Sequence, residues 1–568
     1  MTSTSRHEIP LLPRSARMRL VDRAMTRVLG LPAATTDYSL RRDVPVPMRD
    51  GILLRADHYV PRTSTPAGTL LLRCPYGRGA PLSWLYCRVY AQRGYHVVFQ
   101  SVRGTFGSGG EFEPAGHEVE DGFDTVAWLR REPWFTGTFA TLGQSYLGFT
   151  QWALLVEPPP ELVAAVITVG PHESKSLIAR NGGLALSNLL WWCDQVTHQE
   201  DGGAARRMLR QFTSERGVWA AANRLPLGRS GRELFRVGAP WYEAALEHGD
   251  VTDDYWRRAD VEAAPDRTNI PVLLIGGWQD LFLGQTLEQY RRLQANGARP
   301  ALHVGPWTHL EMLGKAAGAI ARETLPWLAR HLAGTSSTDR SPVRIFVTGG
   351  PGWRDLPEWP PASRPRTLYL SPEATLLERP PTEDAPPSRF TYDPAAPTPT
   401  IGGPFLSATK AGYQDDSALS TRDDVITFTT TPLAHDWEVI GTPTVELEHS
   451  ADNPQADVFV RLSEVDPRGR SQNVTEGYVR RVDHDQEPLR LTLDAIAHRF
   501  RAGMRIRLII AGGSHPHYAR NLGTGEPPLI AFAMKPSNHV IAHGSGGTSC
   551  LHLPVMAPTA TSDEASPQ

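Results

Sequence analysis

Residues 138–152 read TFATLGQSYLGFTQW and place Ser145 between Gly143 and Gly148, directly after a short β-branched and aromatic run. A serine hydroxyl becomes a strong nucleophile when an imidazole removes its proton and a carboxylate orients that imidazole. Taken alone, Ser145 fits a tight strand-to-helix turn or a phosphate loop at least as well. The nucleophile hypothesis therefore requires a histidine and a carboxylate elsewhere in the chain.

Asp280 and His309 meet that requirement, because each follows a predicted strand. The apolar run 270–277 leads to Asp280, and the run 301–304 leads to His309. In an open parallel sheet, ligands bind along the carboxyl ends of the strands, so these side chains are expected to meet at one edge. The chain order Ser145, Asp280, His309 is the order of the triad in α/β-hydrolases.

Each of these residues also has a simpler explanation. Asp280 could cap the helix that follows it, and His309 is one of 19 histidines. His303 competes for the role of base, but it lies inside the predicted strand, where it would pack against the core. The serine motif also departs from G-x-S-x-G, because Leu147 takes the place of the second glycine and Gly148 follows it.

The elements around these residues predict an α/β fold. Short apolar runs alternate with helical patterns, which is typical of βαβ units and a largely parallel sheet. A helix is expected at 117–131, and an antiparallel hairpin at 44–61 that turns at Asp50-Gly51. The predicted core strands are 69–74, 95–102, 138–142, 162–169, 270–277 and 301–304.

Two changes of pattern divide the chain. A tryptophan-rich, mostly helical segment interrupts the α/β pattern and predicts an inserted cap, and after Ser341 short strands separated by Pro/Gly-rich turns predict a β jelly roll. The expected domains are an N-terminal extension at 1–37, an α/β-hydrolase core at 38–170 and 269–338, a helical cap at 171–268, a jelly-roll domain at 339–557 and a disordered tail at 558–568.

Composition excludes several classes of protein. The 568 residues carry 58 Lys+Arg and 61 Asp+Glu, a net charge of -3, interleaved along the chain, so no nucleic-acid partner is expected. No apolar run is long enough to span a membrane, and no secretory signal is evident, so the expected location is the cytoplasm. The four cysteines form no C-x-x-C pair and predict neither disulfides nor a zinc site. The oligomeric state stays open.

Several motifs together resemble the cocaine esterase / X-Pro dipeptidyl-peptidase family of α/β-hydrolases, in which the displaced glycine after the serine is the usual form. The resemblance covers roughly residues 40–555. It rests on GQSYLG (143–148), TQW (150–152), GGWQDLF (276–282), GPWTH (305–309), VPMRDGILLRADHYVP (46–61), RCPYGRG (73–79), VRGTFGSGGEF (102–112), ADVFVRLSEVDPRGRS (456–471) and FRAGMRIRLIIAGGSHPHYARNLGTGE (500–526).

The resemblance implies a role for each matching residue. Ser145 would be the nucleophile, His309 the general base and then acid, and Asp280 the group that orients the histidine. The Tyr76 hydroxyl and the backbone N–H of Tyr146 would form the oxyanion hole. One position departs from the family, since Ser101 stands where an aspartate is usual before Val-Arg-Gly.

The expected activity is hydrolysis of a small-molecule ester or amide through an acyl-serine, without a metal or organic cofactor. The cap and the jelly roll would wall the pocket and favour a bulky or aromatic group. Three alternatives remain: an acyltransferase, an inactive carbohydrate-binding protein, and an X-Pro dipeptidyl-peptidase. The last needs acidic groups to hold a free amine, for which the candidates are Glu118, Glu120, Asp121 and Asp194.

Overall fold

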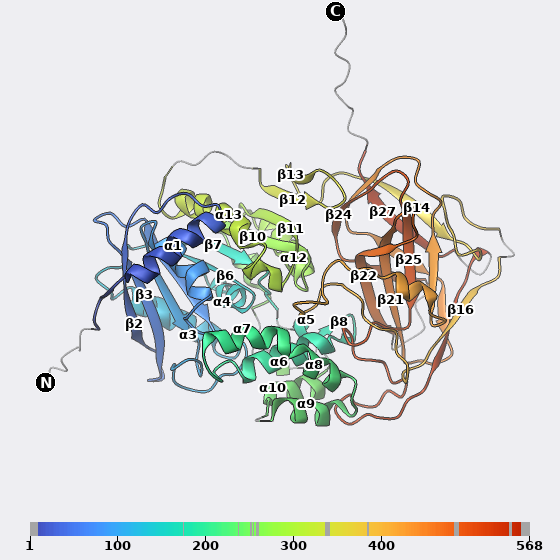
Figure 1. Ribbon diagram of the computed structural model, residues 1–568, viewed down its shortest axis with the longest axis horizontal. Helices are drawn as coiled ribbons and strands as arrows, with labels where there is room; N and C mark the ends of the chain where they lie inside the picture. Colours follow the sequence, from blue (N-terminus) through green and yellow to red (C-terminus); the bar gives the residue numbers. More distant parts are fainter. Residues whose placement is uncertain are drawn as a thin grey trace, which may run out of the picture.

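The computed structural model has three parts that lie side by side (Figure 1): an α/β core, a group of helices and an all-β domain. The predicted tail at 558–568 and residues 1–8 of the predicted N-terminal extension lie outside the described residues. The structure describes residues 9–173, 175–236, 238–249, 253, 255–256, 261–335, 341–382, 385–481, 488–544 and 548–557.

An 11-stranded sheet forms the core. Its strands from β5 to β12 are parallel, and the two edges are antiparallel. In spatial order the strands are β1 (Leu12–Pro13), β2 (Tyr38–Pro47), β3 (Leu53–Pro61), β5 (Tyr95–Ser101), β4 (Gly68–Cys74), β6 (Phe139–Gln144), β7 (Leu162–Thr168), β10 (Val272–Gln279), β11 (Ala301–Thr308), β12 (Val343–Val347) and β13 (Gly352–Leu356).

Helices cover both faces of this sheet, because successive strand residues point to opposite sides. Leu71 packs into the apolar cluster on one face, whereas Leu70 and Leu72 pack into the cluster on the other. The first face is covered by α3 (Glu118–Leu129), α4 (Tyr146–Leu155), α11 (Ala264–Arg267) and α12 (Leu283–Ala295). The second face is covered by α1 (Ala16–Val28), a π-helix (Trp84–Arg88), α2 (Val89–Ala91) and α13 (Ala317–His331).

The tryptophan-rich segment folds into short helices with their own apolar cluster (Figure 1). Leu281 and Leu310, which follow β10 and β11, pack against that cluster, so the segment lies near the carboxyl ends of these strands. Buried leucines of α6 and an aromatic pair, Phe235 and Tyr242, form much of that cluster. The elements are α5 (Lys175–Ile178), β8 (Ala179–Arg180), β9 (Gly183–Leu184), α6 (Leu186–Thr197), α7 (Ala204–Thr213), α8 (Glu215–Ala222), α9 (Leu227–Phe235) and α10 (Pro240–Glu247). We call this group of helices the cap.

The C-terminal part is all-β and antiparallel, as the sequence predicted. A seven-stranded sheet and a four-stranded sheet enclose its apolar core. Its strands are β14 (Arg364–Leu370), β15 (Leu376–Leu377), β16 (Ser388–Tyr392), β17 (Val425–Thr429), β18 (Trp437–Gly441), β19 (Thr444–Leu447), β20 (His449–Ala451), β21 (Ala456–Val465), β22 (Ser471–Arg481), β23 (Leu489–Thr492), β24 (Ile496–Phe500), β25 (Arg505–Ala511), β26 (Ser537–Ile541) and β27 (Cys550–Val555).

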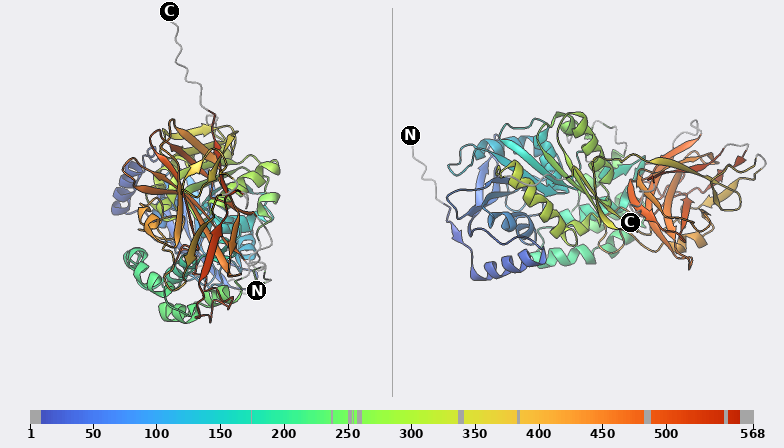
Figure 2. Two further views of the ribbon diagram at one scale, coloured as in Figure 1. Left: turned by 90° about the vertical axis from the view of Figure 1, so that its right-hand side faces the viewer. Right: turned by 90° about the horizontal axis from the view of Figure 1, so that it is seen from above.

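The core and the β domain meet end to end, as the view from above makes clear (Figure 2). β12 lies in the segment assigned from sequence to the β domain, yet it pairs in parallel with β11 and extends the core sheet. The residues of a strand do not by themselves specify which strand it pairs with, so the sequence alone did not assign β12 to the core sheet. The domain limits given above therefore stay predictions. Among the described helices, none combines the length and apolarity that crossing a membrane requires.

Candidate active site

Ser145 occupies a strained turn between β6 and α4, with φ of 57° and ψ of -123°. This is the left-handed half of the backbone map, which non-glycine residues rarely enter. The two flanking glycines make the turn possible. A Cβ at Gly143 would lie 2.4 Å from the Cβ of Leu147, and a Cβ at Gly148 would lie 2.4 Å from the Cα of Gly170. The displaced glycine is therefore required where α4 crosses the end of β7.

Asp280 and His309 reach Ser145 from the carboxyl ends of β10 and β11. The Nε2 of His309 lies 2.9 Å from the Ser145 Oγ, and its Nδ1 lies 2.6 Å from the Asp280 Oδ2. The other oxygen of Asp280 accepts a 2.8 Å hydrogen bond from the Phe282 amide, which fixes the carboxylate. Asp280 and His309 are 2% and 5% exposed, so bulk water does not compete for these bonds.

His303 is buried within β11, as expected from its place in the strand. Its Nδ1 lies 3.6 Å from the Glu323 carboxylate, and its ring packs against those of Trp307 and Trp353. The structure thus brings His309, and not His303, to Ser145.

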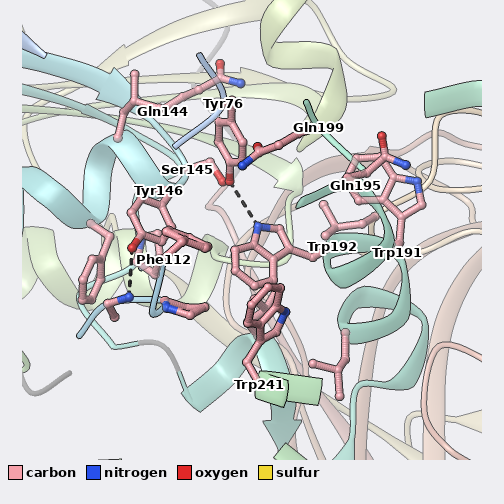
Figure 3. Close-up of a pocket in the computed structure, with 18 of the residues that line it drawn as sticks. Tyr76, Phe112, Gln144, Ser145, Tyr146, Trp191, Trp192, Gln195, Gln199 and Trp241 are labelled. Carbon is pink, nitrogen blue, oxygen red and sulfur yellow. Dashed lines mark hydrogen bonds between the residues drawn. The ribbon is translucent and has the colours of Figure 1, made fainter. Parts of the chain in front are cut away.

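Tyr76 points its hydroxyl toward Ser145 (Figure 3). The hydroxyl oxygen accepts a 3.2 Å hydrogen bond from the indole N–H of Trp192, so its own hydrogen is left to donate. Burial raises the pKa of Tyr76 to about 12, and hydrogen bonds with Trp192 and Ser145 oppose that rise. The phenol consequently stays neutral near pH 7, as a hydrogen-bond donor must.

Tyr146 begins α4, so its backbone N–H is one of the first amides of the helix, which have no partner within it. Its side chain is anchored away from the serine. The hydroxyl donates to the Glu118 Oε1 at 2.8 Å and accepts from the Ala115 amide at 2.9 Å. Burial raises the pKa of Glu118, and the Arg73 guanidinium 2.9 Å away opposes that rise.

A cavity of about 980 Å³ opens in front of Ser145 between the core and the cap. Its walls carry many aromatic side chains, and Figure 3 shows several of these rings around the serine. The β domain contributes Leu406 among the described lining residues, so its share of the wall is smaller than the sequence suggested. The aromatic lining residues are Tyr76, Phe112, Tyr146, Phe149, Trp191, Trp192, Phe212, Trp241, Tyr255, Trp256 and Phe282.

The segment around Leu406 is tied down on the cap. The Leu406 amide donates to the Asn188 Oδ1 at 2.8 Å. Glu215 is buried and accepts three hydrogen bonds from the residues that follow Leu406, namely from the Ser407 hydroxyl at 2.7 Å, the Ala408 amide at 2.8 Å and the Thr409 hydroxyl at 2.7 Å. We call residues 406–409 the strap.

The acidic residues considered as amine ligands do not line the cavity. Glu120 is exposed on α3. The other three are buried and each is paired with an arginine. These pairs are Glu118 with Arg73 at 2.9 Å, Asp121 with Arg103 at 2.6 Å and Asp194 with Arg210 at 2.6 Å. Their charges are thus already compensated within the protein.

Ser101, which replaces the family's usual aspartate, accepts a 2.5 Å hydrogen bond from Arg78. The same guanidinium bonds the Asp57 carboxylate at 3.2 Å and forms an ion pair with Asp43. Carboxylates from β2 and β3 therefore supply the negative charge that residue 101 lacks. The loop that carries Tyr76 is anchored by Arg78 in spite of the substitution.

Sequence reasoning missed the supporting residues of the site. Trp192 lies in the tryptophan-rich segment that predicts the cap, and no sequence motif assigns a function to Trp192, Asn188 or Glu215. Their partners, Tyr76 and the strap, lie far away in the sequence. No local pattern marks such long-range hydrogen bonds.

Comparison with known proteins gives the same picture. The family model described as X-Pro dipeptidyl-peptidase (S15 family) matches residues 50–311, and the model of the X-Pro dipeptidyl-peptidase C-terminal non-catalytic domain matches residues 336–552. Cocaine esterase of Rhodococcus sp. (strain MB1 Bresler) is 29% identical over 547 residues, which cover 86% of this chain and 93% of that protein.

Two solved structures share the fold over nearly the whole chain. An aminopeptidase from a marine sediment Thaumarchaeota archaeon has a TM-score of 0.79 at 21% identity, covering 93% of this chain and 98% of that one. An α-amino acid ester hydrolase has a TM-score of 0.77 at 23% identity, with 92% and 98% covered. The chain is a serine hydrolase with an α/β-hydrolase core and a C-terminal all-β domain, and it belongs to the cocaine esterase / X-Pro dipeptidyl-peptidase family.

Proposed function

We propose that Ser145, His309 and Asp280 act as a catalytic triad. The single observation that carries this proposal is the continuous path of two hydrogen bonds, 2.9 Å and 2.6 Å long, from the serine hydroxyl through the imidazole to the carboxylate. His309 would take the serine proton as the Oγ attacks the substrate carbonyl. It would then pass that proton to the leaving alcohol, and water would release the acid by the reverse sequence.

The oxyanion formed in this reaction would be held by two donors. The neutral Tyr76 hydroxyl faces the serine, and the Tyr146 amide lies at the start of α4, where the helix dipole also favours negative charge. Preorganised donors of this kind lower the barrier because charge develops where they already point. The chain's own residues therefore supply the nucleophile, the base and the oxyanion hole.

The cavity supports an ester with a bulky apolar or aromatic group as substrate. Its volume of about 980 Å³ exceeds what a short acyl chain would fill, and its wall is rich in aromatic rings. A relative named cocaine esterase is consistent with such a substrate class. The net charge of -3 supports a small-molecule substrate over a nucleic acid, and four free buried cysteines support a reducing, cytoplasmic setting.

A dipeptidyl-peptidase activity is less well supported. Recognition of a free amino terminus requires a carboxylate that faces the substrate and is not already paired with a cationic side chain of the protein. Three of the four candidate carboxylates are engaged by arginines, and none of the four lines the cavity. Glu111 and Glu113 do line the cavity and are the remaining carboxylates that could hold a free amine, but its largely apolar, aromatic-rich wall favours esters over Gly-Pro amides.

The mechanism is tested by labelling with a fluorophosphonate, which reacts with activated serines. We expect stoichiometric labelling of the wild type and none of Ser145→Ala, with strongly slowed labelling of His309→Ala. Ser64→Ala and His435→Ala change exposed residues and should label normally. Labelling of Ser145→Ala, or an unlabelled wild type, would refute the proposal.

A substrate panel separates the possible reactions of the same triad. Nitrophenyl esters of increasing acyl size, up to benzoyl, are compared with Gly-Pro-nitroanilide. We expect kcat/KM to rise with acyl size and the anilide to be cleaved poorly. Rapid anilide cleavage would select the peptidase, and formation of a new ester or amide on adding an alcohol or amine would select the acyltransferase.

A further inference from the structure

The outer face of the seven-stranded sheet carries an unusual group of side chains. On β27, Leu551 and Leu553 point into the core of the β domain, so Cys550 and His552 project from the opposite face. Glu446 of β19 is paired directly opposite Cys550 and shares that face. A thiol, an imidazole and a carboxylate are therefore neighbours on two adjacent strands. They lie on the face of the seven-stranded sheet that points away from the core of the β domain.

The distances among these groups suit a metal ion. The Cys550 Sγ and the His552 Nε2 are 3.3 Å apart, and the His552 Nε2 lies 4.0 Å from the Glu446 Oε1. All three ligand atoms lie within 4.8 Å of one another. In tetrahedral zinc sites, bonds of about 2.3 Å to sulfur and about 2.0–2.1 Å to nitrogen place these two ligand atoms roughly 3.5 Å apart.

His552 is also held in the orientation that a ligand needs. Its Nδ1 lies 3.0 Å from the hydroxyl of Thr367, the residue directly opposite it on β14. With Nδ1–H donating to that oxygen, the lone pair of Nε2 points to Cys550 and Glu446. Metal-binding histidines are commonly fixed by such a hydrogen bond from the second ring nitrogen.

Two features of the free protein oppose metal binding, and a divalent cation would overcome both. Burial, with Glu446 nearby, raises the pKa of the Cys550 thiol to about 11, so the free thiol is protonated near pH 7. A divalent cation would displace that proton by coordination. Arg490 bonds the Glu446 Oε1 at 3.2 Å, but its side chain is 74% exposed, and such surface pairs contribute little.

We propose that Glu446, Cys550 and His552 form a binding site for a divalent transition-metal ion, with Zn²⁺ as the ion that this ligand set favours. Thiolate, imidazole and carboxylate are all common zinc ligands, and water would complete the tetrahedron. The ion would join β19 to β27 and release the thiol proton to solvent on binding. The site is separate from Ser145 and has no part in acyl transfer.

The test uses Co²⁺ as a spectroscopic probe of the full-length protein. We expect one equivalent to bind at micromolar concentration, with the absorption band of thiolate-to-cobalt charge transfer, and Zn²⁺ to abolish that band by competition. Cys550→Ser and His552→Ala should lose the band. His435→Ala, an exposed histidine of the same domain, should keep it. The other three cysteines are buried and unchanged in every variant.

Two further measurements make the result decisive. Zn²⁺ should raise the Tm of the wild type and slow alkylation of Cys550, which peptide mass spectrometry detects. Fluorophosphonate labelling of Ser145 should stay unchanged in every variant and reports that the variant is folded. Absence of the band in the wild type, its survival in Cys550→Ser, or saturation only at millimolar metal would each overturn the proposal.

Discussion

At the scale of single residues, hydrogen bonds from neighbouring groups restrict how each residue of the candidate site can interact. Trp192 donates to the oxygen of Tyr76, so the phenol hydrogen is left to donate toward the serine. Phe282 occupies one oxygen of Asp280, so the other is left for the imidazole. Each of these partners narrows the orientations available to the reacting group. This restriction holds the reacting groups close to the geometry that the reaction requires.

Tyr76→Phe should lower kcat about 10²- to 10³-fold with little change in KM, because it removes one oxyanion donor and keeps the ring. Trp192→Phe should have a smaller effect on kcat, since the donor survives and only its orientation is relaxed. Steady-state kinetics with a nitrophenyl ester measure both. Equal kcat for wild type and Tyr76→Phe would exclude Tyr76 from the oxyanion hole.

At the scale of elements, the cavity is completed by a segment from a different domain. Asn188 of α6 and Glu215 of α8 hold the strap by four hydrogen bonds, and Leu406 of the strap lines the cavity. The position of the β domain is therefore coupled to the shape of the cavity. The turn at Ser145 depends in the same way on how closely α4 approaches β7.

Glu215→Ala should raise KM for a bulky ester several-fold while leaving kcat and the cleavage of short acetyl esters nearly unchanged. The reason is that the strap loses three hydrogen bonds but touches no reacting atom. Glu247→Ala, an exposed carboxylate of α10, is the matched control. A parallel loss of kcat on every ester would indicate general damage to the fold rather than a loosened wall.

Gly148→Ala should destabilise the protein strongly, because the new methyl group would lie 2.4 Å from the Gly170 backbone. Overpacking of this kind costs about 1–3 kcal/mol or more. Gly284→Ala, in α12, meets nothing within 4 Å and should be neutral or slightly stabilising. Thermal unfolding compares the two. Similar Tm values for both variants would show that the crossing of α4 can relax.

At the scale of the whole molecule, several histidines are buried in neutral form. His58 and His96 contact each other through ring nitrogens 3.0 Å apart, and burial lowers the pKa of His96 to about 4 and that of His58 well below 6.5. Burial likewise lowers the pKa of His172 to about 4 and that of His515 to about 3. The unfolded chain takes up protons at these sites that the native protein does not.

Stability should consequently fall as the pH drops from about 6.5 toward 4, since the unfolded state binds more protons throughout this range. Each unit of displaced pKa corresponds to about 1.4 kcal/mol. Chemical denaturation at a series of pH values measures the slope. His96→Asn should flatten the acid limb relative to the wild type, whereas His435→Asn, at an exposed position, should leave it unchanged. An acid limb that His96→Asn leaves as steep would exclude the buried pair as a cause.

The sequence by itself determined the local features of this protein. Apolar runs marked the strands of the core, so β4, β5, β6, β7, β10 and β11 form where they were predicted. The carboxyl ends of β10 and β11 then placed Asp280 and His309, and the glycines around residue 145 indicated the turn. These predictions succeeded because hydrophobic periodicity and the turns that glycine permits are properties of a few consecutive residues.

Only the tertiary structure decided which distant residues meet. It paired Trp192 with Tyr76, engaged three of the four candidate carboxylates with arginines, added β12 to the core sheet and brought Glu446 to Cys550 and His552. Most of these contacts join segments far apart along the chain. The free energy of each contact depends on burial and geometry that arise after the chain has folded, so no local pattern of residues encodes it.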